Sequence, residues 1–197
     1  MGTVEYGKTR NAEGAGKMSP NMNYYGRASR AEEQGNLVSA AADYAMVGLE
    51  GLIREEFTPS RRIRVSLAHL LQSVSCDVRA DNFDRAEGVF EICKPNLRRI
   101  QEGCGDDVLE ALMEEWLGDG SLMLGKGCAV DHYTQASKVY ERVDVTHENW
   151  GFEEEFDYAY WAFESYIESE GFTLPDDSDY NFVKKIHAKL DFTGELA

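Results

Sequence analysis

Residues 32–47 read EEQGNLVSAAADYAMV, and two later stretches of the 197-residue chain repeat their pattern. These stretches are VRADNFDRAEGVFEIC at 78–93 and CAVDHYTQASKVYERV at 128–143. In each stretch a turn precedes a large apolar residue, which is followed by an alanine three positions later and by an aromatic residue after four more. A smaller apolar residue comes three positions after that. The apolar residues therefore recur at the spacing of one helix face.

The alanine and the aromatic residue have complementary packing roles. An alanine lets a neighbouring helix approach closely, and the aromatic side chain one turn later fills the space between helix pairs. Helical apolar spacing extends from residue 21 onward, and no segment shows the period-two alternation of a strand. We therefore predict an all-α fold of about eight helices, arranged as antiparallel pairs that stack because one pair cannot bury its apolar faces alone.

The chain divides into a tail and one domain. Residues 1–20 are rich in glycine and aperiodic, which predicts a flexible N-terminal tail. Residues 21–197 form a single helical domain whose last part, 144–197, holds acidic helices. The four prolines are expected between helices. The fifth helix is expected to be interrupted near Gly118 and Gly120.

With these turn, alanine and aromatic positions, residues 21–143 resemble the tetratricopeptide repeat (TPR) family. The first unit is the most similar. Tyr24 stands at the bulky opening position of the family, Ala28 at its small position, and Gly35-Asn36 at its turn. The resemblance implies stacked antiparallel helix pairs that wind into a right-handed α-solenoid.

The spacing between the units departs from the family pattern. From Ala40 to Ala86 there are 46 residues and from Ala86 to Ala136 there are 50, whereas the family repeats about every 34 residues. The proline that closes many family repeats is also absent from its usual place. An unrelated helical bundle with a coincidental alanine–aromatic spacing therefore stays open as the alternative.

The resemblance also implies a function, because the first helices of successive pairs line a groove for a peptide or a partner helix in that family. We therefore expect a non-enzymatic adaptor. Among the matching groove positions only one residue is cationic, so clamping of a C-terminal carboxylate, as in the chaperone-binding members, is disfavoured. The groove positions are Tyr25, Ser29, Glu32, Glu33, Leu71, Ser75, Val78 and Arg79.

The charge of the chain is unevenly distributed. The formal net charge is −16, but residues 1–100 carry 14 basic and 13 acidic side chains, whereas residues 101–197 carry 6 and 23. Direct binding to nucleic acid or to an anionic membrane is therefore disfavoured. A partner of the second half is expected to present a basic surface. The alternative function is an acidic regulator or DNA mimic that occupies a basic nucleic-acid-binding protein.

Further expectations concern chemistry and location. No helical metal pair, Walker loop, dinucleotide motif or nucleophile elbow is found, so no cofactor, metal site or catalytic residue is expected. A small helical enzyme with an unrecognised site remains a minor alternative. The sequence lacks an apolar run that is long enough for a transmembrane helix. We therefore expect a cytoplasmic protein.

Two charged clusters stand out as candidate surfaces. We expect an acidic partner face at Glu153, Glu154, Glu155 and Asp157. We expect a basic patch, in a loop around Pro59, at Arg54, Arg61, Arg62 and Arg64. Contact between the near-neutral first half of one copy and the acidic second half of another would produce salt-sensitive self-association.

Overall fold

The computed structural model of the protein describes residues 20–54, 61–143, 153–173 and 182–195, and these residues form eight α-helices and no strand. The predicted all-α fold is therefore confirmed for this part of the chain. The expected N-terminal tail lies outside it, except for Pro20, which opens the first helix. In chain order the helices are α1 (Pro20–Glu33), α2 (Leu37–Arg54), α3 (Arg61–Arg79), α4 (Phe83–Cys104), α5 (Asp107–Met123), α6 (Ala129–Tyr140), α7 (Glu153–Ser169) and α8 (Phe182–Glu195).

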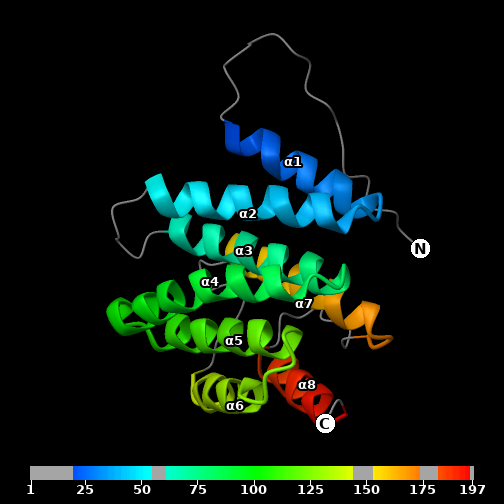
Figure 1. Ribbon diagram of the computed structural model, residues 1–197. Coiled ribbons are helices and arrows are strands. Elements are labelled where there is room, and N and C mark those ends of the chain that lie inside the picture. Colours follow the sequence, from blue (N-terminus) through cyan, green and yellow to red (C-terminus); the bar gives the residue numbers. More distant parts are fainter. Residues whose placement is uncertain (1–19, 55–60, 144–152, 174–181, 196–197) are drawn as a thin grey trace, which may run out of the picture.

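Helices α1 to α6 form a row in which each helix packs against the next one in the chain (Figure 1). The last two helices do not extend this row in order. Helix α7 returns to α3 and lies behind it in Figure 1, whereas α8 packs against α6. Because His69 contacts Tyr158 and Ser75 contacts Ala162, α7 runs parallel to α3. The acidic C-terminal part is therefore split between two places in the fold.

The turns that precede the repeated helices share one geometry. Gly35, Asp81 and Gly125 have left-handed backbones, with φ values of 73°, 59° and 64°. In all three turns the amide of this residue donates to the carbonyl three positions back, and the next amide donates to the carbonyl five positions back. This pattern is the Schellman motif. The left-handed residue stands five positions before the alanine in the first two units, at Gly35 and Asp81, but eleven positions before Ala136 in the third. The turn predicted inside the third stretch is therefore wrong, because α6 already begins at Ala129.

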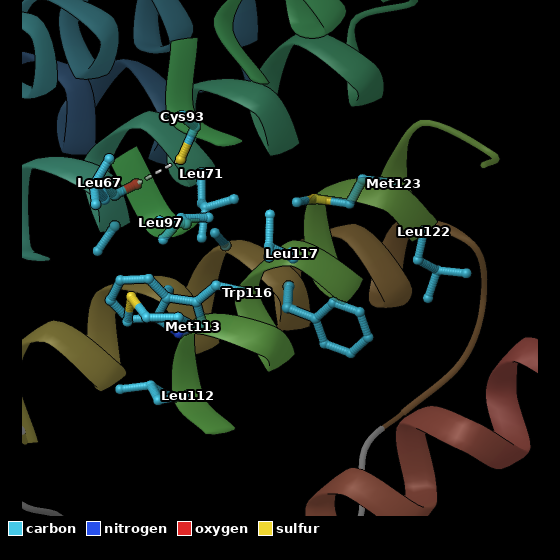
Figure 2. Packing of buried hydrophobic residues seen from close by; sticks show 14 of the residues in the cluster. Leu67, Leu71, Cys93, Leu97, Leu112, Met113, Trp116, Leu117, Leu122 and Met123 are labelled. Atoms are coloured by element: carbon cyan, nitrogen blue, oxygen red, sulfur yellow. Dashed lines mark hydrogen bonds between the residues drawn. The ribbon is translucent and has the colours of Figure 1, made fainter. Parts of the chain in front are cut away.

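The alanine and aromatic positions of the repeated units belong to the core. Their side chains are at most 3% exposed, at Ala40, Ala86, Ala136, Tyr44, Phe90 and Tyr140. The large residue that opens each unit is less uniform, since Tyr133 is fully buried while Phe83 is about half exposed. Figure 2 shows the centre of the main cluster, where Leu67 of α3, Cys93 of α4 and Trp116 of α5 converge.

Helix α5 runs without a break over its whole length, so the interruption predicted near Gly118 and Gly120 is wrong. Both glycines are buried, and a methyl group at either position would overlap an aromatic ring, that of Tyr133 or of Phe90 respectively. The absence of a side chain lets α6 and α4 approach the backbone of α5 closely. These glycines therefore mark tight helix crossings.

The expectation that every proline lies between helices is wrong at Pro95, which is inside α4. Proline lacks an amide hydrogen and its ring crowds the carbonyl four residues back, here that of Glu91. Both Pro95 and Glu91 lie on the exposed side of α4, where the long helix has room to accommodate the ring.

A buried ionic network fixes α8 against α5 and α6. The Lys189 ammonium, 1% exposed, donates to the carboxylates of Glu115 and Asp119 at 2.6 and 2.7 Å. The hydroxyls of Tyr133 and Tyr140 donate to Asp119 and Glu115, each at 2.9 Å. We call these five side chains the core network. Every charged group in it therefore has a partner, as buried charges require.

Protonation in the core network follows from its charge balance. Burial by itself would lower the pKa of Lys189, but Asp119 and Glu115 together raise this pKa above its ordinary value, so the ammonium stays charged. One cation balances only one of two carboxylates. Burial accordingly raises the pKa of Asp119 to about 7 despite the attraction of Lys189.

Candidate functional site

A pocket of about 150 Å³ lies where α7 meets the first three helices. Its α1 side chains recur at i, i+4 and i+7 and so share one helix face. We call it the α1–α7 pocket. Trp161 is 47% exposed at this pocket. The pocket is lined by Tyr25, Ser29, Glu32, Tyr44, Gln72, Trp161, Ala162 and Ser165.

Glu32 is the only charged residue that lines the pocket within the described part of the chain. One of its carboxylate oxygens accepts a hydrogen bond from the Arg79 guanidinium at 2.5 Å, and the other accepts one from the Tyr44 hydroxyl at 3.0 Å. Burial and the neighbouring Glu32 carboxylate raise the pKa of Tyr44 above its ordinary value, so the hydroxyl stays protonated and donates. Glu32 therefore ties α1 to both α2 and α3.

Aromatic rings from four helices contact one another, at Tyr25, Tyr44, His69 and Tyr158. The centroid of the buried His69 ring lies 5.2 Å from that of Tyr25 and 4.8 Å from that of Tyr158. Tyr158 and Trp161 of α7 meet edge to face at 5.7 Å. The His69 ring is held in place by the Gln72 amide, with 2.7 Å between Nδ1 and Oε1. The pocket therefore has an ordered aromatic wall.

A second pocket, of about 350 Å³, follows the first along α7 and contains the half-exposed Phe83. Trp161 and Ser165 line the first pocket, and Ser169, one further turn along the same helix face, lines the second. Arg79 lines the second pocket while it binds Glu32 of the first. We call it the α3–α5 pocket, lined by Val78, Arg79, Asp81, Phe83, Met123, Leu124, Gly125, Tyr166, Ser169 and Glu170.

Five of the eight predicted groove positions lie at these pockets. Tyr25, Ser29 and Glu32 line the α1–α7 pocket. Val78 and Arg79 line the α3–α5 pocket. Residues that are separated by about fifty positions in the sequence are therefore brought to one continuous path beside α7.

The other three groove positions have different surroundings. Leu71 and Ser75 are buried, and the Ser75 hydroxyl donates to the Ala162 carbonyl of α7 at 2.6 Å. Ser75 is therefore covered by α7, whereas Leu71 belongs to the main apolar cluster shown in Figure 2, and neither position faces a partner in this structure. Glu33 is exposed and accepts a hydrogen bond from the Ser29 hydroxyl at 3.3 Å.

The predicted charged clusters are only partly visible. The side chains of the acidic partner face, Glu153, Glu154, Glu155 and Asp157, lie outside the described residues, although α7 begins at the first of them. The side chains of Arg54 and Arg61 also lie outside. Arg62 is exposed, but Arg64 is 8% exposed because its position in α3 faces the interior. Arg64 therefore adds nothing to an exposed basic patch, and it belongs to a helix instead of the predicted loop.

Sequence reasoning did not assign Tyr44, Gln72, Trp161 or Ser165 to a site. Tyr44 carried a signal as the aromatic of the first repeated unit, but that signal predicts core packing equally well. Trp161 and Ser165 share a helix face, yet only the return of α7 to α3 places them opposite α1. No local pattern in the sequence encodes that return.

Comparisons with family models, curated proteins and solved structures found no match. Within the described ranges, no three His, Cys, Asp or Glu side chains are grouped so that they would hold a metal ion. None of the described helices is both long and apolar enough to cross a membrane.

Proposed function

We propose that this protein is a non-enzymatic scaffold with TPR-like helix stacking that binds a segment of a partner protein beside α7. The observation that carries the proposal is the α1–α7 pocket. It unites the groove positions Tyr25, Ser29 and Glu32 with the half-exposed Trp161. Exposed tryptophan and tyrosine in a concave site are the side chains that contribute most to protein–protein binding energy.

The shared turns support the TPR-like part of the proposal. Three helix pairs begin their second helix after the same Schellman turn, and the following alanine and aromatic positions are buried alike. In such a stack the first helices of the pairs, α1, α3 and α5, would form one concave side of a right-handed solenoid. Helix α7 would then occupy part of the groove that the family leaves open.

The arrangement of the pockets supports an extended peptide as the bound segment. The two pockets follow each other along α7 and are separated by the Glu32–Arg79 ion pair. A peptide that lies beside α7 would place one side chain in each pocket. The Glu32 carboxylate, which lines the first pocket, accepts hydrogen bonds from two donors. A carboxylate held in this way is better suited to recognising a ligand than to transferring a proton.

Selection from a random peptide library displayed on phage tests this proposal. Peptides selected on the wild-type chain should lose binding to Ser29→Trp, because the new ring fills the α1–α7 pocket. The matched control is Val130→Trp, which adds the same ring at a 45% exposed helix position outside both pockets. We expect a loss of about tenfold or more for Ser29→Trp and none for Val130→Trp.

Two results would count against the proposal. If no selected peptide depends on the pocket, the scaffold function fails. If the peptides bind both variants equally and dissociate with added salt, the acidic regulator alternative gains instead, because its binding would rest on exposed charge.

A further inference from the structure

We propose that the α1–α7 pocket takes the alkylammonium head group of a partner's lysine, either unmodified or methylated. This inference rests on the proposed peptide-binding function, and it names the side chain that the first pocket selects. It is carried by the aromatic lining, by the single carboxylate, and by the size of the pocket.

The lining of the pocket offers what a cation requires. Tyr25, Tyr44 and Trp161 supply aromatic rings, whose faces attract an ammonium group through their quadrupole. Hydroxyl oxygens of Ser29 and Ser165 are available as additional acceptors. No cationic side chain is among the described residues that line this pocket.

The charges that surround the pocket also favour a cation. Arg79 is held against Glu32 on the far side of the carboxylate, toward the α3–α5 pocket. Arg27, which also belongs to α1, forms an ion pair with Asp43 at 3.1 Å. These two cations are thus each balanced by a carboxylate, and the sequence of α7, EEEFDYAYWAFESYIES, carries acidic residues but no basic one. A basic segment would therefore be attracted to this face from a distance.

The size of the pocket matches a small head group. A cavity of about 150 Å³ accommodates a molecule as large as benzene, and a trimethylammonium group with its first methylene is no larger. Because the Glu32 oxygens already accept hydrogen bonds from Arg79 and Tyr44, the aromatic rings supply most of the remaining attraction. A methylated ammonium group, which needs few hydrogen bonds, is therefore accepted as well as an unmodified one.

The test compares four probes on the full chain by nuclear magnetic resonance of the Trp161 indole N–H, assigned with Trp161→Phe. The probes are N-acetyl-lysine methylamide, its trimethylated form, the neutral norleucine analogue, and choline. We expect saturable shifts at concentrations about tenfold lower for both lysine probes than for norleucine. Binding of choline alone would overturn the lysine assignment and indicate a free quaternary ammonium ligand.

Variants show whether the pocket is responsible for this binding. Tyr25→Leu should weaken binding of the lysine probes about tenfold, and Ser29→Lys should abolish it, because a resident ammonium group would compete. The matched control is Phe83→Leu, which removes an exposed ring from the neighbouring pocket and should have no effect. Should Tyr25→Leu fail to fold, Ser29→Lys against the neutral Ser29→Met gives the same decision. Equal affinity for norleucine, or equal losses in Phe83→Leu and Tyr25→Leu, would overturn the inference.

The selected peptides and the lysine probes together distinguish failure of this inference from failure of the proposed function. If the selected peptides depend on the pocket but contain no enriched lysine, the function stands and the cation assignment falls. If the lysine probes bind in the pocket but no peptide does, the cation assignment stands and the scaffold function falls.

Discussion

Two ionic clusters with the same chemistry lie at opposite ends of the helix row. In each one a carboxylate accepts hydrogen bonds from a cation and from a tyrosine hydroxyl. At the first end, the side chains of Arg79 and Glu32 are 18% and 24% exposed beside a pocket. At the other end, the side chains of Lys189 and Glu115 are 1% and 3% exposed. Burial is the main difference between the first cluster, which borders a pocket, and the second, which fastens a helix and contains a second carboxylate.

The difference matters because water can replace a partner at only one of the two ends. If Arg79 leaves Glu32, solvent from the adjacent pocket can hydrate both groups. If Lys189 leaves Glu115 and Asp119, two carboxyl groups stay in an apolar interior. The first cluster can therefore rearrange, whereas the second has to stay intact for α8 to remain docked.

The largest expected effect is that of Lys189→Met, which removes the charge but keeps a long apolar side chain. We expect a loss of about 3–5 kcal/mol in the free energy of unfolding, measured with urea, because the buried carboxylates lose their cation. Adding Asp119→Asn should recover part of the loss. The control is Lys138→Met on the exposed side of α6, with a change within about 0.5 kcal/mol. A similar effect for both lysines would remove the contrast between the two clusters.

The next effect is a dependence on pH that originates in Asp119. Its carboxyl group has a pKa of about 7 in the fold, against an ordinary value of 3.8. The folded chain therefore binds an extra proton between these values, and this group's contribution to stability falls as the pH rises from about 4 to about 7. In Asp119→Asn this decline should disappear from the urea midpoints. An unchanged slope would show that Asp119 is ionised throughout.

A smaller effect is expected at the tight helix crossing in α5. Gly120→Ala should destabilise the fold by about 1–3 kcal/mol in urea unfolding, because the added methyl group overlaps the ring of Phe90. The matched change is Gly88→Ala in α4, where the new methyl group meets nothing. This variant should gain up to about 1 kcal/mol from helix propensity. Equal changes of the same sign would mean that α4 and α5 cross less tightly than in this structure.

The smallest effect is expected at the open cluster. Arg79→Met should lower the free energy of unfolding by about 1 kcal/mol, since the ion pair is partly exposed and Glu32 keeps the Tyr44 hydrogen bond. Peptide binding should respond more strongly than stability does. A loss in stability as large as that of Lys189→Met would make the two clusters equivalent.

Local sequence patterns predicted the local structure well. The alanine at 40, 86 and 136 and the aromatic that follows each one are buried as their spacing requires, because one helix turn brings such residues to a single face. The same reasoning failed at Gly118, Gly120 and Pro95. A helix packed against neighbours tolerates these residues where another helix or a free surface accommodates them.

Local sequence patterns did not predict which helices pack against each other. Lys189, Glu115 and Asp119 resemble ordinary surface charges in the sequence, since spacing shows a helix face but not which helix covers it. The packing of α7 against α3 was not predicted for the same reason. It covers Ser75 and leaves Tyr25, Ser29 and Glu32 at a pocket. The sequence therefore predicted only part of the candidate site, namely the positions that lie beside α7 and are not covered by it.

The return of α7 to α3 also has a consequence for the order of folding. The hydrogen bond from Ser75 to Ala162 joins residues 87 positions apart, whereas the pairs within the row are joined by short turns. Contacts between distant segments close larger loops and form more slowly. We therefore expect α1 to α6 to assemble first and α7 to dock late. During that interval the chain would expose the face of α3 that α7 later covers, and hydrogen exchange should record α7 as an early region to open.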